Sequence, residues 1–273
     1  MKLIVSANSL AHLNELFKKQ IDGVILSIDK LAVNDAFYIN VNMLDEINFN
    51  GKEVFVSLNK LMHNSDLAYL RKVLKDLKDK DVKILFYDMA VYNIAKEYNM
   101  TSKLVIYQDH LNASVLSNKF YLDLGIKTSY ITSDITKEEL LEIKENSGMN
   151  ICFLGYGYGP IFYSRRYLIS NYLKYIKHKS GQEYKIISDM GTVYPIEEEA
   201  YGTAIYTEKP INLINHLDEL ETIDYIVLKS HKIADNEFNK MVDKFIKREH
   251  ISDDYIGFYD TKTVYRVKQV KDE

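Results

Sequence analysis

The feature that most constrains the fold is a regular alternation of short apolar runs with stretches of helical spacing. Eight runs rich in β-branched and aromatic residues recur, and segments between them place apolar residues every three or four positions. The runs are apolar at nearly every position, as in VKILF and KLVIY, which is typical of parallel strands buried on both faces. The predicted strands cover residues 2–7, 23–28, 53–59, 82–88, 103–109, 127–134, 150–155 and 224–229.

Eight strand–helix units in one domain predict an α/β fold, a TIM-type (β/α)8 barrel that takes in the whole chain, residues 1–273. The runner-up is an open, doubly wound sheet, because the period alone does not show closure. The chain has no GxGxxG at its first turn and no GxxxxGK[ST] motif, so the usual nucleotide-binding reasons for an open sheet are missing.

The repeat breaks between the seventh and eighth strands. Residues 156–222 are predicted to form an insertion, with a Gly-rich turn, a helix over 164–176 and a small hairpin from strands near 185–188 and 203–206. After a last helix over 236–249, alternation over 254–269 predicts a C-terminal hairpin.

Composition sets limits on the environment and on cofactors. The chain is 47% hydrophobic, opens without a signal peptide and lacks an apolar stretch of about 20 residues, so we expect a cytoplasmic protein with no membrane contact. Its net charge of −4 means that nucleic acid would need a local basic patch. The single cysteine, Cys152, excludes an internal disulfide and any cluster or zinc site held by several cysteines of this chain.

Two motifs in the insertion carry a resemblance to a known family. The run GYGPIFYSRR at 157–166, followed by Leu168 and SNY at 170–172, resembles the signature of peptidase family U32. The run YPIEEEAYGT at 194–203 is closely similar to the family's YPI-x-ED-x-x-GT segment. With the repeat before them, the two motifs account for nearly the whole chain.

The resemblance implies several possible activities. The family is named for collagenase-like proteases, which are hydrolases, and other members look like proteins of tRNA wobble-uridine hydroxylation or of oxygen-independent quinone hydroxylation. Many hold an iron–sulfur cluster on four cysteines, but this chain has Pro160 and Ile161 where a cysteine is common. It also has Tyr156-Gly157 in place of His-Gly and Ser133-Asp134 in place of Arg-Glu.

We therefore expect a U32 protein without an iron–sulfur cluster or other cofactor. It would be an enzyme or an accessory subunit in tRNA wobble-uridine hydroxylation, with a longer, cysteine-bearing family relative as a possible partner. The alternative is a collagenase-like protease or hydrolase, with or without an assisting metal ion. Either role needs a binding site, which in this fold lies where the strands end.

The residues at the predicted strand ends converge on one mouth. A ligand is therefore predicted to contact Asn59, Asp88, Gln108, Asp109, His110, Asp134 and Tyr156. Helix capping by Asp and Asn is the alternative for any one of them. A carboxylate beside an imidazole at 109–110 could orient a general base or bind metal, but adjacent strand residues point to opposite faces, so no metal site is predicted.

Ser164, Arg165 and Arg166 are expected to open the helix of the insertion. Two guanidiniums near a helix N-terminus suit a phosphate or carboxylate, so we predict that these residues and Glu198 bind tRNA or a small anion. The alternative is internal pairing of an arginine with Glu198 or Glu199. No catalytic residue is identified, since Ser164 lacks a GxSxG context.

Overall fold

Eight parallel strands form a closed barrel in the computed structural model, which describes residues 1–108, 111–178 and 184–262. The barrel closes because β1 pairs with both β14 and β2. This confirms the predicted TIM-type barrel and excludes the open sheet. In order around the barrel the strands are β1 (Lys2–Ser6), β14 (Tyr225–Leu228), β8 (Asn150–Gly157), β7 (Thr128–Tyr130), β6 (Leu104–Tyr107), β5 (Lys83–Phe86), β4 (Glu53–Leu58) and β2 (Gly23–Ile28).

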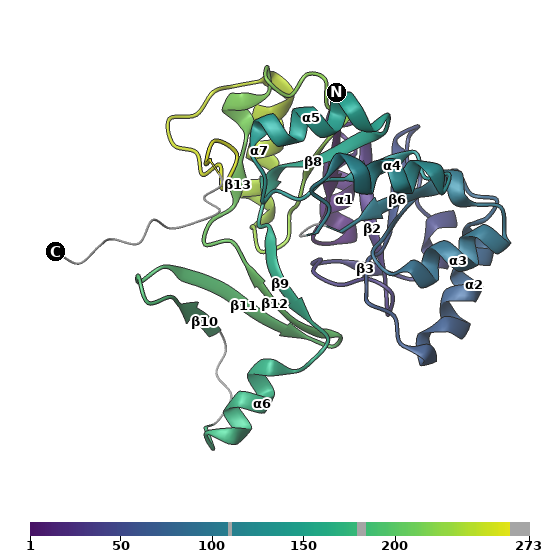
Figure 1. The fold of residues 1–273 in the computed structure, drawn as a ribbon, viewed down its shortest axis with the longest axis horizontal. Coiled ribbons are helices and arrows are strands. Elements are labelled where there is room, and N and C mark those ends of the chain that lie inside the picture. Colours follow the sequence, from purple (N-terminus) through teal and green to yellow (C-terminus); the bar gives the residue numbers. More distant parts are fainter. Residues whose placement is uncertain (109–110, 179–183, 263–273) are drawn as a thin grey trace.

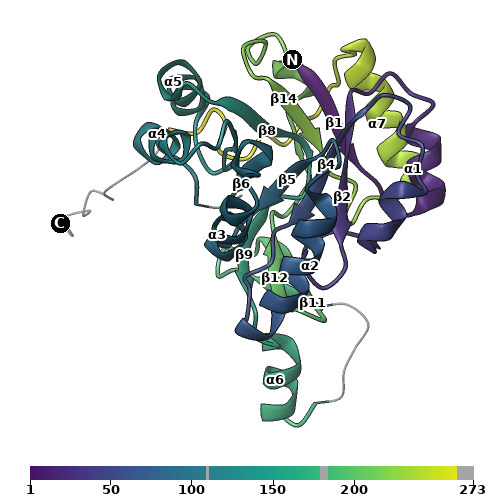
Figure 2. The same ribbon diagram turned by 90° about the vertical axis from the view of Figure 1, so that its right-hand side faces the viewer.

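Helices surround the strands (Figures 1 and 2). Their ends follow local capping rules. The side chain of Ser9 accepts a hydrogen bond from the N–H of His12, and Thr136 and Glu139 form a reciprocal capping box. The apolar stripe of α2 is buried as its spacing predicts. The helices of the ring are α1 (Leu10–Leu16), α2 (Leu67–Leu77), α3 (Met89–Glu97), α4 (Val115–Asp123), α5 (Lys137–Ser147) and α7 (Asp235–Lys247).

The second unit of the barrel lacks an α-helix. After β2 the chain forms a loop, the short strand β3 (Tyr38–Ile39) and the 3-10 helix η1 (Val41–Asp45). Lys30 and Asn34 in this loop have positive φ angles of 67° and 62°, which a helix does not allow. Three further 3-10 turns are η2 (Asn64–Asp66), η3 (Thr101–Lys103) and η4 (Ile214–His216).

The insertion forms a four-stranded antiparallel sheet that projects from the barrel, with α6 near its far end (Figure 1). This is larger than the small hairpin predicted. The helix also starts later than expected, at Leu168 rather than 164, because Ser164 still pairs with Thr203 in the sheet. The elements are β9 (Pro160–Ser164), α6 (Leu168–Tyr175), β10 (Tyr184–Ile187), β11 (Val193–Glu199) and β12 (Gly202–Tyr206).

The chain returns to the barrel through β13 (Ile211–Asn212), which pairs antiparallel with β8. Residues 254–262 contain turns and no strand, and residues 263–269 lie outside the described part, so the C-terminal hairpin stays a prediction. Among the described residues, no helix is long and apolar enough to cross a membrane.

Candidate functional site

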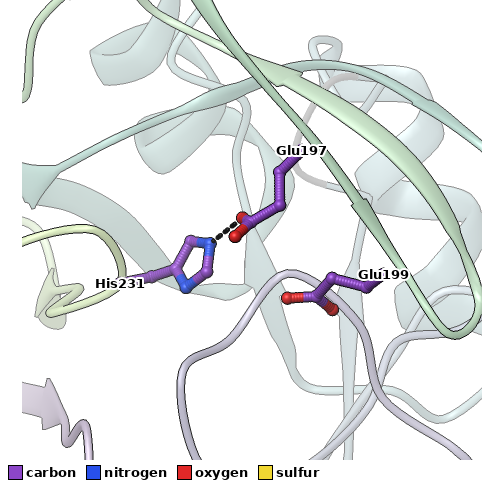
Figure 3. Close-up of side chains that lie close together, drawn as sticks. All are labelled: Glu197, Glu199 and His231. Carbon is purple, nitrogen blue, oxygen red and sulfur yellow. Dashed lines mark hydrogen bonds and ion pairs between the residues drawn. The ribbon is translucent and has the colours of Figure 1, made fainter. Parts of the chain in front are cut away.

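Strand β11 carries three consecutive glutamates whose side chains alternate between its two faces. Glu197 and Glu199 are two residues apart, so they share the face that looks toward the barrel mouth (Figure 3). Glu198 points the other way, toward α6, where its carboxylate accepts hydrogen bonds from the backbone N–H and the hydroxyl of Ser170. The alternation thus separates one glutamate that supports the insertion from two that face the barrel.

His231 comes from the loop after β14 and meets Glu197. The two are joined by a hydrogen bond of 2.9 Å between Nε2 and Oε2, and Lys232 Nζ lies 3.1 Å from the same oxygen. The hydrogen bond from His231, aided by the charge of Lys232, lowers the pKa of Glu197 to about 2 although burial opposes this. An ionised carboxylate only accepts hydrogen bonds, so Nε2 carries a proton.

Glu199 has the opposite electrostatic character. Its pKa is raised, mainly by burial and further by the negative charges of Glu197 and Asp35. It accepts a hydrogen bond of 3.0 Å from the hydroxyl of Tyr38. Two neighbouring carboxyls with pKa values moved in opposite directions are typical of sites that transfer protons, with one group as acid and the other as base.

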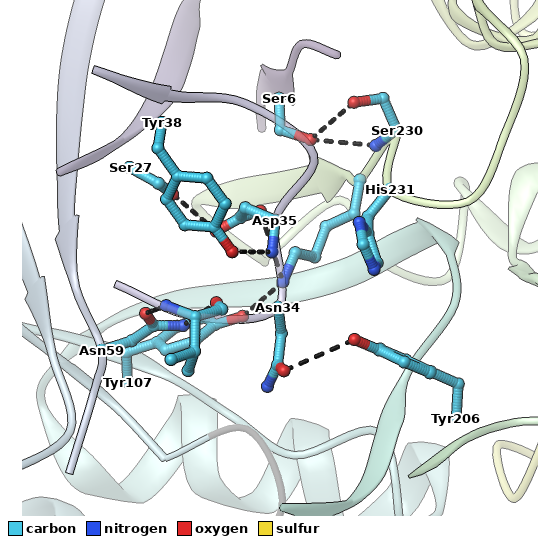
Figure 4. A network of polar contacts seen from close by, with 12 residues as sticks. Ser6, Ser27, Asn34, Asp35, Tyr38, Asn59, Tyr107, Tyr206, Ser230 and His231 are labelled. Atoms are coloured by element: carbon cyan, nitrogen blue, oxygen red, sulfur yellow. Dashed lines mark hydrogen bonds and ion pairs between the residues drawn. The ribbon is translucent and has the colours of Figure 1, made fainter. Parts of the chain in front are cut away.

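A chain of polar contacts continues from Tyr38 into the barrel (Figure 4). The hydroxyl of Tyr38 accepts the N–H of Asp35 at 3.2 Å, and Ser27 donates to the carboxylate of Asp35 at 2.6 Å. Lys229 Nζ lies 4.0 Å from that carboxylate and donates to the hydroxyl of Tyr107 at 2.8 Å. Asp35 and Lys229 are only 6% and 5% exposed. Burying a charged group costs free energy, and the opposite charge of each residue offsets part of that cost for the other.

These side chains border a cavity of about 1140 Å³ between the barrel mouth and the projecting sheet. The barrel supplies one wall and β10, β11 and α6 supply the other. Charges of both signs line it, so a polar ligand could be held by acceptors on one side and donors on the other. Its lining includes Asp35, Tyr38, Tyr158, Ser170, Leu173, Tyr184, Lys185, Glu197, Glu198, Glu199, Glu208, His231 and Lys232.

Two of the predicted strand-end residues are occupied with structural contacts. Asn59 is buried and bonds both the N–H and the carbonyl of Val33 through its side-chain amide. Asp88 caps α3 by accepting the N–H of Ala90, and it also accepts the N–H of Met62. For Asp88 the structure supplies the capping alternative, and a ligand contact at either residue stays a prediction.

The other predicted strand-end residues are dispersed. Tyr156 packs its ring against Phe238 of α7, at a centroid distance of 6.1 Å, so it faces outward rather than into the cavity. Gln108 accepts the hydroxyl of Tyr121 at 3.1 Å. Asp134 is exposed and does not line the cavity. Residues 109 and 110, the predicted Asp-His pair, lie outside the described part of the chain.

Arg165 and Arg166 are exposed on the turn between β9 and α6. Arg165 donates to the carbonyl of Met62 in the loop after β4, at 3.0 Å, so the turn touches the barrel mouth. Among the described residues neither guanidinium forms an ion pair, so the predicted pairing with Glu198 or Glu199 is absent. The arginines also do not open the helix as expected. Helix α6 starts at Leu168, and the backbone N–H of Ser170 in its first turn donates to Glu198 instead of to a ligand.

Sequence reasoning missed the residues that the structure brings together, namely Asp35, Tyr38, Glu197, Glu199 and His231. The strand alternation of the YPIEEE run was a usable signal for the two glutamates. The loop after β2 that carries Asp35, and the start of β3 that carries Tyr38, offered none, because neither residue stands at the end of a predicted strand.

The structure also identifies which residues could hold a metal ion. Among the described residues, one group of three or more potential ligands clusters closely enough, namely Glu197, Glu199 and His231. Cys152 is buried and burial raises its pKa, so it is neither a ready ligand nor a nucleophile.

Comparisons with known proteins agree with this architecture. The chain is 27% identical over 179 residues to tRNA hydroxylation protein P2 of Bacillus subtilis (strain 168), a match that covers 62% of this chain and 58% of that relative. The chain thus spans less than two thirds of the relative's length. The solved structure of the U32 peptidase Mk0906 has a TM-score of 0.53 at 13% identity, covering 84% of this chain and 92% of that one, which supports the fold alone. Residues 8–237 match the profile of peptidase family U32, and the chain belongs to that family.

Proposed function

We propose that this protein takes part in tRNA hydroxylation at the wobble uridine, as an enzyme or as an accessory subunit, and binds an anionic ligand at the barrel mouth. The observation that carries this proposal is the similarity to a tRNA hydroxylation protein over 179 residues. A large cavity lined by charged groups at the strand ends is consistent with it. A protein that acts on tRNA is expected to lie in the cytoplasm.

Arg165 and Arg166 are the groups we propose for the anion. They are exposed, lie beside the barrel mouth and form no ion pair with a described residue, so their charges are available to phosphate. The acidic groups of the cavity do not reach them, since Glu198 bonds Ser170 and Glu199 bonds Tyr38. Ser164 supports the turn by accepting the N–H of Arg166.

The accessory role is supported by what this chain lacks and by what its insertion exposes. One cysteine cannot hold a four-cysteine cluster, so a longer, cysteine-bearing relative would supply one. Large apolar side chains are exposed on the projecting sheet and α6, where such a partner could cover them. They include Tyr172, Tyr175, Ile187 and Met190, which are 61%, 84%, 68% and 92% exposed.

The test compares tRNA nucleosides from cells with and without the gene. Loss of hydroxylated wobble uridine that the wild-type gene restores would support the proposal, and an unchanged profile would refute it. Complementation with Arg166→Gln then tests the anion site, because this substitution removes a charge without removing the contact of Arg165 with Met62. Co-purification with a cysteine-bearing relative distinguishes a subunit from an enzyme that acts alone.

A collagenase-like protease, with or without an assisting metal ion, is the second candidate. The pairing of His231 with Glu197 beside the cavity favours it, because an oriented imidazole can act as a general base. The assay uses purified protein and denatured collagen with and without a chelator. Cleavage that His231→Gln abolishes would support this function, and intact collagen in every condition would refute it.

A further inference from the structure

We propose that Glu197, Glu199 and His231 bind one divalent transition-metal ion at the rim of the cavity. The inference goes beyond the proposed function and does not depend on it. It rests on side chains that the chain brings together from two distant segments, one strand of the insertion and one loop of the barrel (Figure 3). An ion held there would tie the projecting sheet to the barrel.

The geometry of the donors fits a single ion. Each residue offers one ligand atom, and these three atoms lie within 4.8 Å of one another. Metal–ligand bonds of about 2.0–2.2 Å place donor atoms roughly 3–4 Å apart, so small side-chain rotations close the site. Glu197 and Glu199 already share one face of β11, which fixes two donors on a rigid element.

His231 supports the site through a second, independent observation. The residue is 7% exposed, and its Nδ1 is buried without a hydrogen-bond partner in the described part of the chain. In the neutral imidazole, a proton on Nε2 toward Glu197 leaves an unprotonated lone pair on Nδ1. In Figure 3 one ring nitrogen lies on the hydrogen bond to Glu197, and the other lies on the lower side of the ring. Buried polar atoms of this kind are rare and often mark an ion or water.

The surrounding charges favour a cation. Glu197, Glu199 and Asp35 bring three carboxyls together, and their mutual repulsion raises the pKa of Glu199 beyond the effect of burial. The hydroxyl of Tyr38 donates to Glu199, the kind of outer contact that orients a metal-binding carboxylate. Lys232 opposes the site, since its ammonium lies 3.1 Å from Glu197 Oε2 and must withdraw when an ion binds.

The mixed donor set predicts which ions bind. Imidazole suits zinc, iron and other transition metals, whereas magnesium and calcium prefer sites made of oxygen alone. One nitrogen and two carboxylates therefore favour Zn²⁺, Fe²⁺ or Mn²⁺ over Mg²⁺.

Calorimetric titration of the metal-free, full-length protein with Zn²⁺, Mn²⁺ and Mg²⁺ tests the proposal. We expect one site that prefers Zn²⁺ or Mn²⁺ to Mg²⁺. Glu197→Gln, Glu199→Gln and His231→Gln should each weaken it at least about 10-fold. Glu198→Gln is the matched control, because it removes the same charge from the neighbouring position on the opposite face of β11 and should leave binding unchanged.

A further variant keeps the proposal testable if substitution of a metal-binding residue disturbs folding. Lys232→Gln removes the competing ammonium and should tighten binding severalfold. The absorption spectrum of bound Co²⁺ should change in His231→Gln and stay the same in Glu198→Gln. Absence of binding at millimolar ion, equal losses in Glu198→Gln and Glu199→Gln, or weaker binding in Lys232→Gln would each overturn the proposal. None of these readouts uses tRNA, so a failure of the metal-site proposal can be distinguished from a failure of the proposed function.

Discussion

Lys229 Nζ donates a hydrogen bond of 2.8 Å to the hydroxyl of Tyr107 across the interior of the barrel. Lys229 directly follows β14 and Tyr107 is the last residue of β6, and these strands are separated by β8 and β7 in the sheet order. Lys229 is 5% exposed, and the one carboxylate with which it forms an ion pair in the described part of the chain, that of Asp35, is 4.0 Å away. The phenol therefore supplies the short contact of this buried ammonium.

Tyr107→Phe tests the stabilising effect of that contact. Removing the hydroxyl leaves a buried ammonium with fewer acceptors, so we expect the free energy of unfolding to fall by about 1–3 kcal/mol. Urea denaturation measures it. Tyr172→Phe, at a side chain that is 61% exposed, is the control and should change it by less than about 0.5 kcal/mol. Equal effects in the two variants would contradict this account.

The barrel could be predicted from the sequence because strands buried on both faces must be apolar at nearly every position. All eight predicted strands exist, and β2 matches its predicted range at both ends. Insertion strands such as β10 and β11 are largely exposed or half-buried, so their apolar pattern is weaker and their sheet was underestimated. The burial of the barrel strands, more than the β-propensity of their residues, therefore made them recognisable in the sequence.

The site was harder to predict, and Tyr156 shows why. Its position at the end of β8 suggested the mouth, but the pairing with β14 shifts by one residue between Val227 and Leu228. Gly155 is the extra residue, and such a bulge re-aims the side chain that follows it, here toward Phe238. A pattern of alternating residues does not reveal a bulge. The contacts of Asp35 and Tyr38 depend equally on the path of a loop.

Alkaline stability should depend on Tyr156. Burial raises its pKa to about 12, while a tyrosine in an unfolded chain titrates near 10. Because the folded state holds this proton more tightly than the unfolded chain, the tyrosine's contribution to the free energy of unfolding is complete below about pH 10. It is lost as the pH rises from about 10 to about 12. Tyr156→Phe should lessen that loss by about 1 kcal/mol at pH 11.

Urea denaturation at pH 8, 10 and 11 would measure the loss for each protein. Tyr175→Phe is the control, since Tyr175 is 84% exposed. A Tyr156→Phe protein that loses as much stability as the Tyr175→Phe protein over this range would show that Tyr156 does not contribute.

Gly157 is required by the close approach of β8 to Lys229. Its φ is +131°, and a Cβ there would lie 2.6 Å from the carbonyl oxygen of Lys229. Gly157→Ala should therefore lower the free energy of unfolding by about 2–4 kcal/mol and displace Lys229. Gly51→Ala is the matched comparison, because Gly51 also has a positive φ but no atom within 4 Å of a Cβ, and about 1 kcal/mol is expected. Thermal unfolding of both variants measures the two losses of stability. Similar losses in Gly157→Ala and Gly51→Ala would rule out the steric explanation.

Glu198 lines the cavity, but its contacts predict that it stabilises α6 rather than acting with Glu197 and Glu199. Its carboxylate accepts the N–H of Ser170 in the first turn of α6, and it also lies 3.3 Å from the hydroxyl of Thr203 on β12. A negative charge at a helix N-terminus is favourable, so Glu198→Gln should cost about 1 kcal/mol. Hydrogen exchange should locate the loss in α6, with amides of the barrel strands unchanged. Ser170→Ala removes the hydroxyl but keeps the N–H contact, so it should have a smaller effect. Faster exchange around His231 and Tyr38 in Glu198→Gln would instead show that this glutamate stabilises the side of the cavity that holds those two residues.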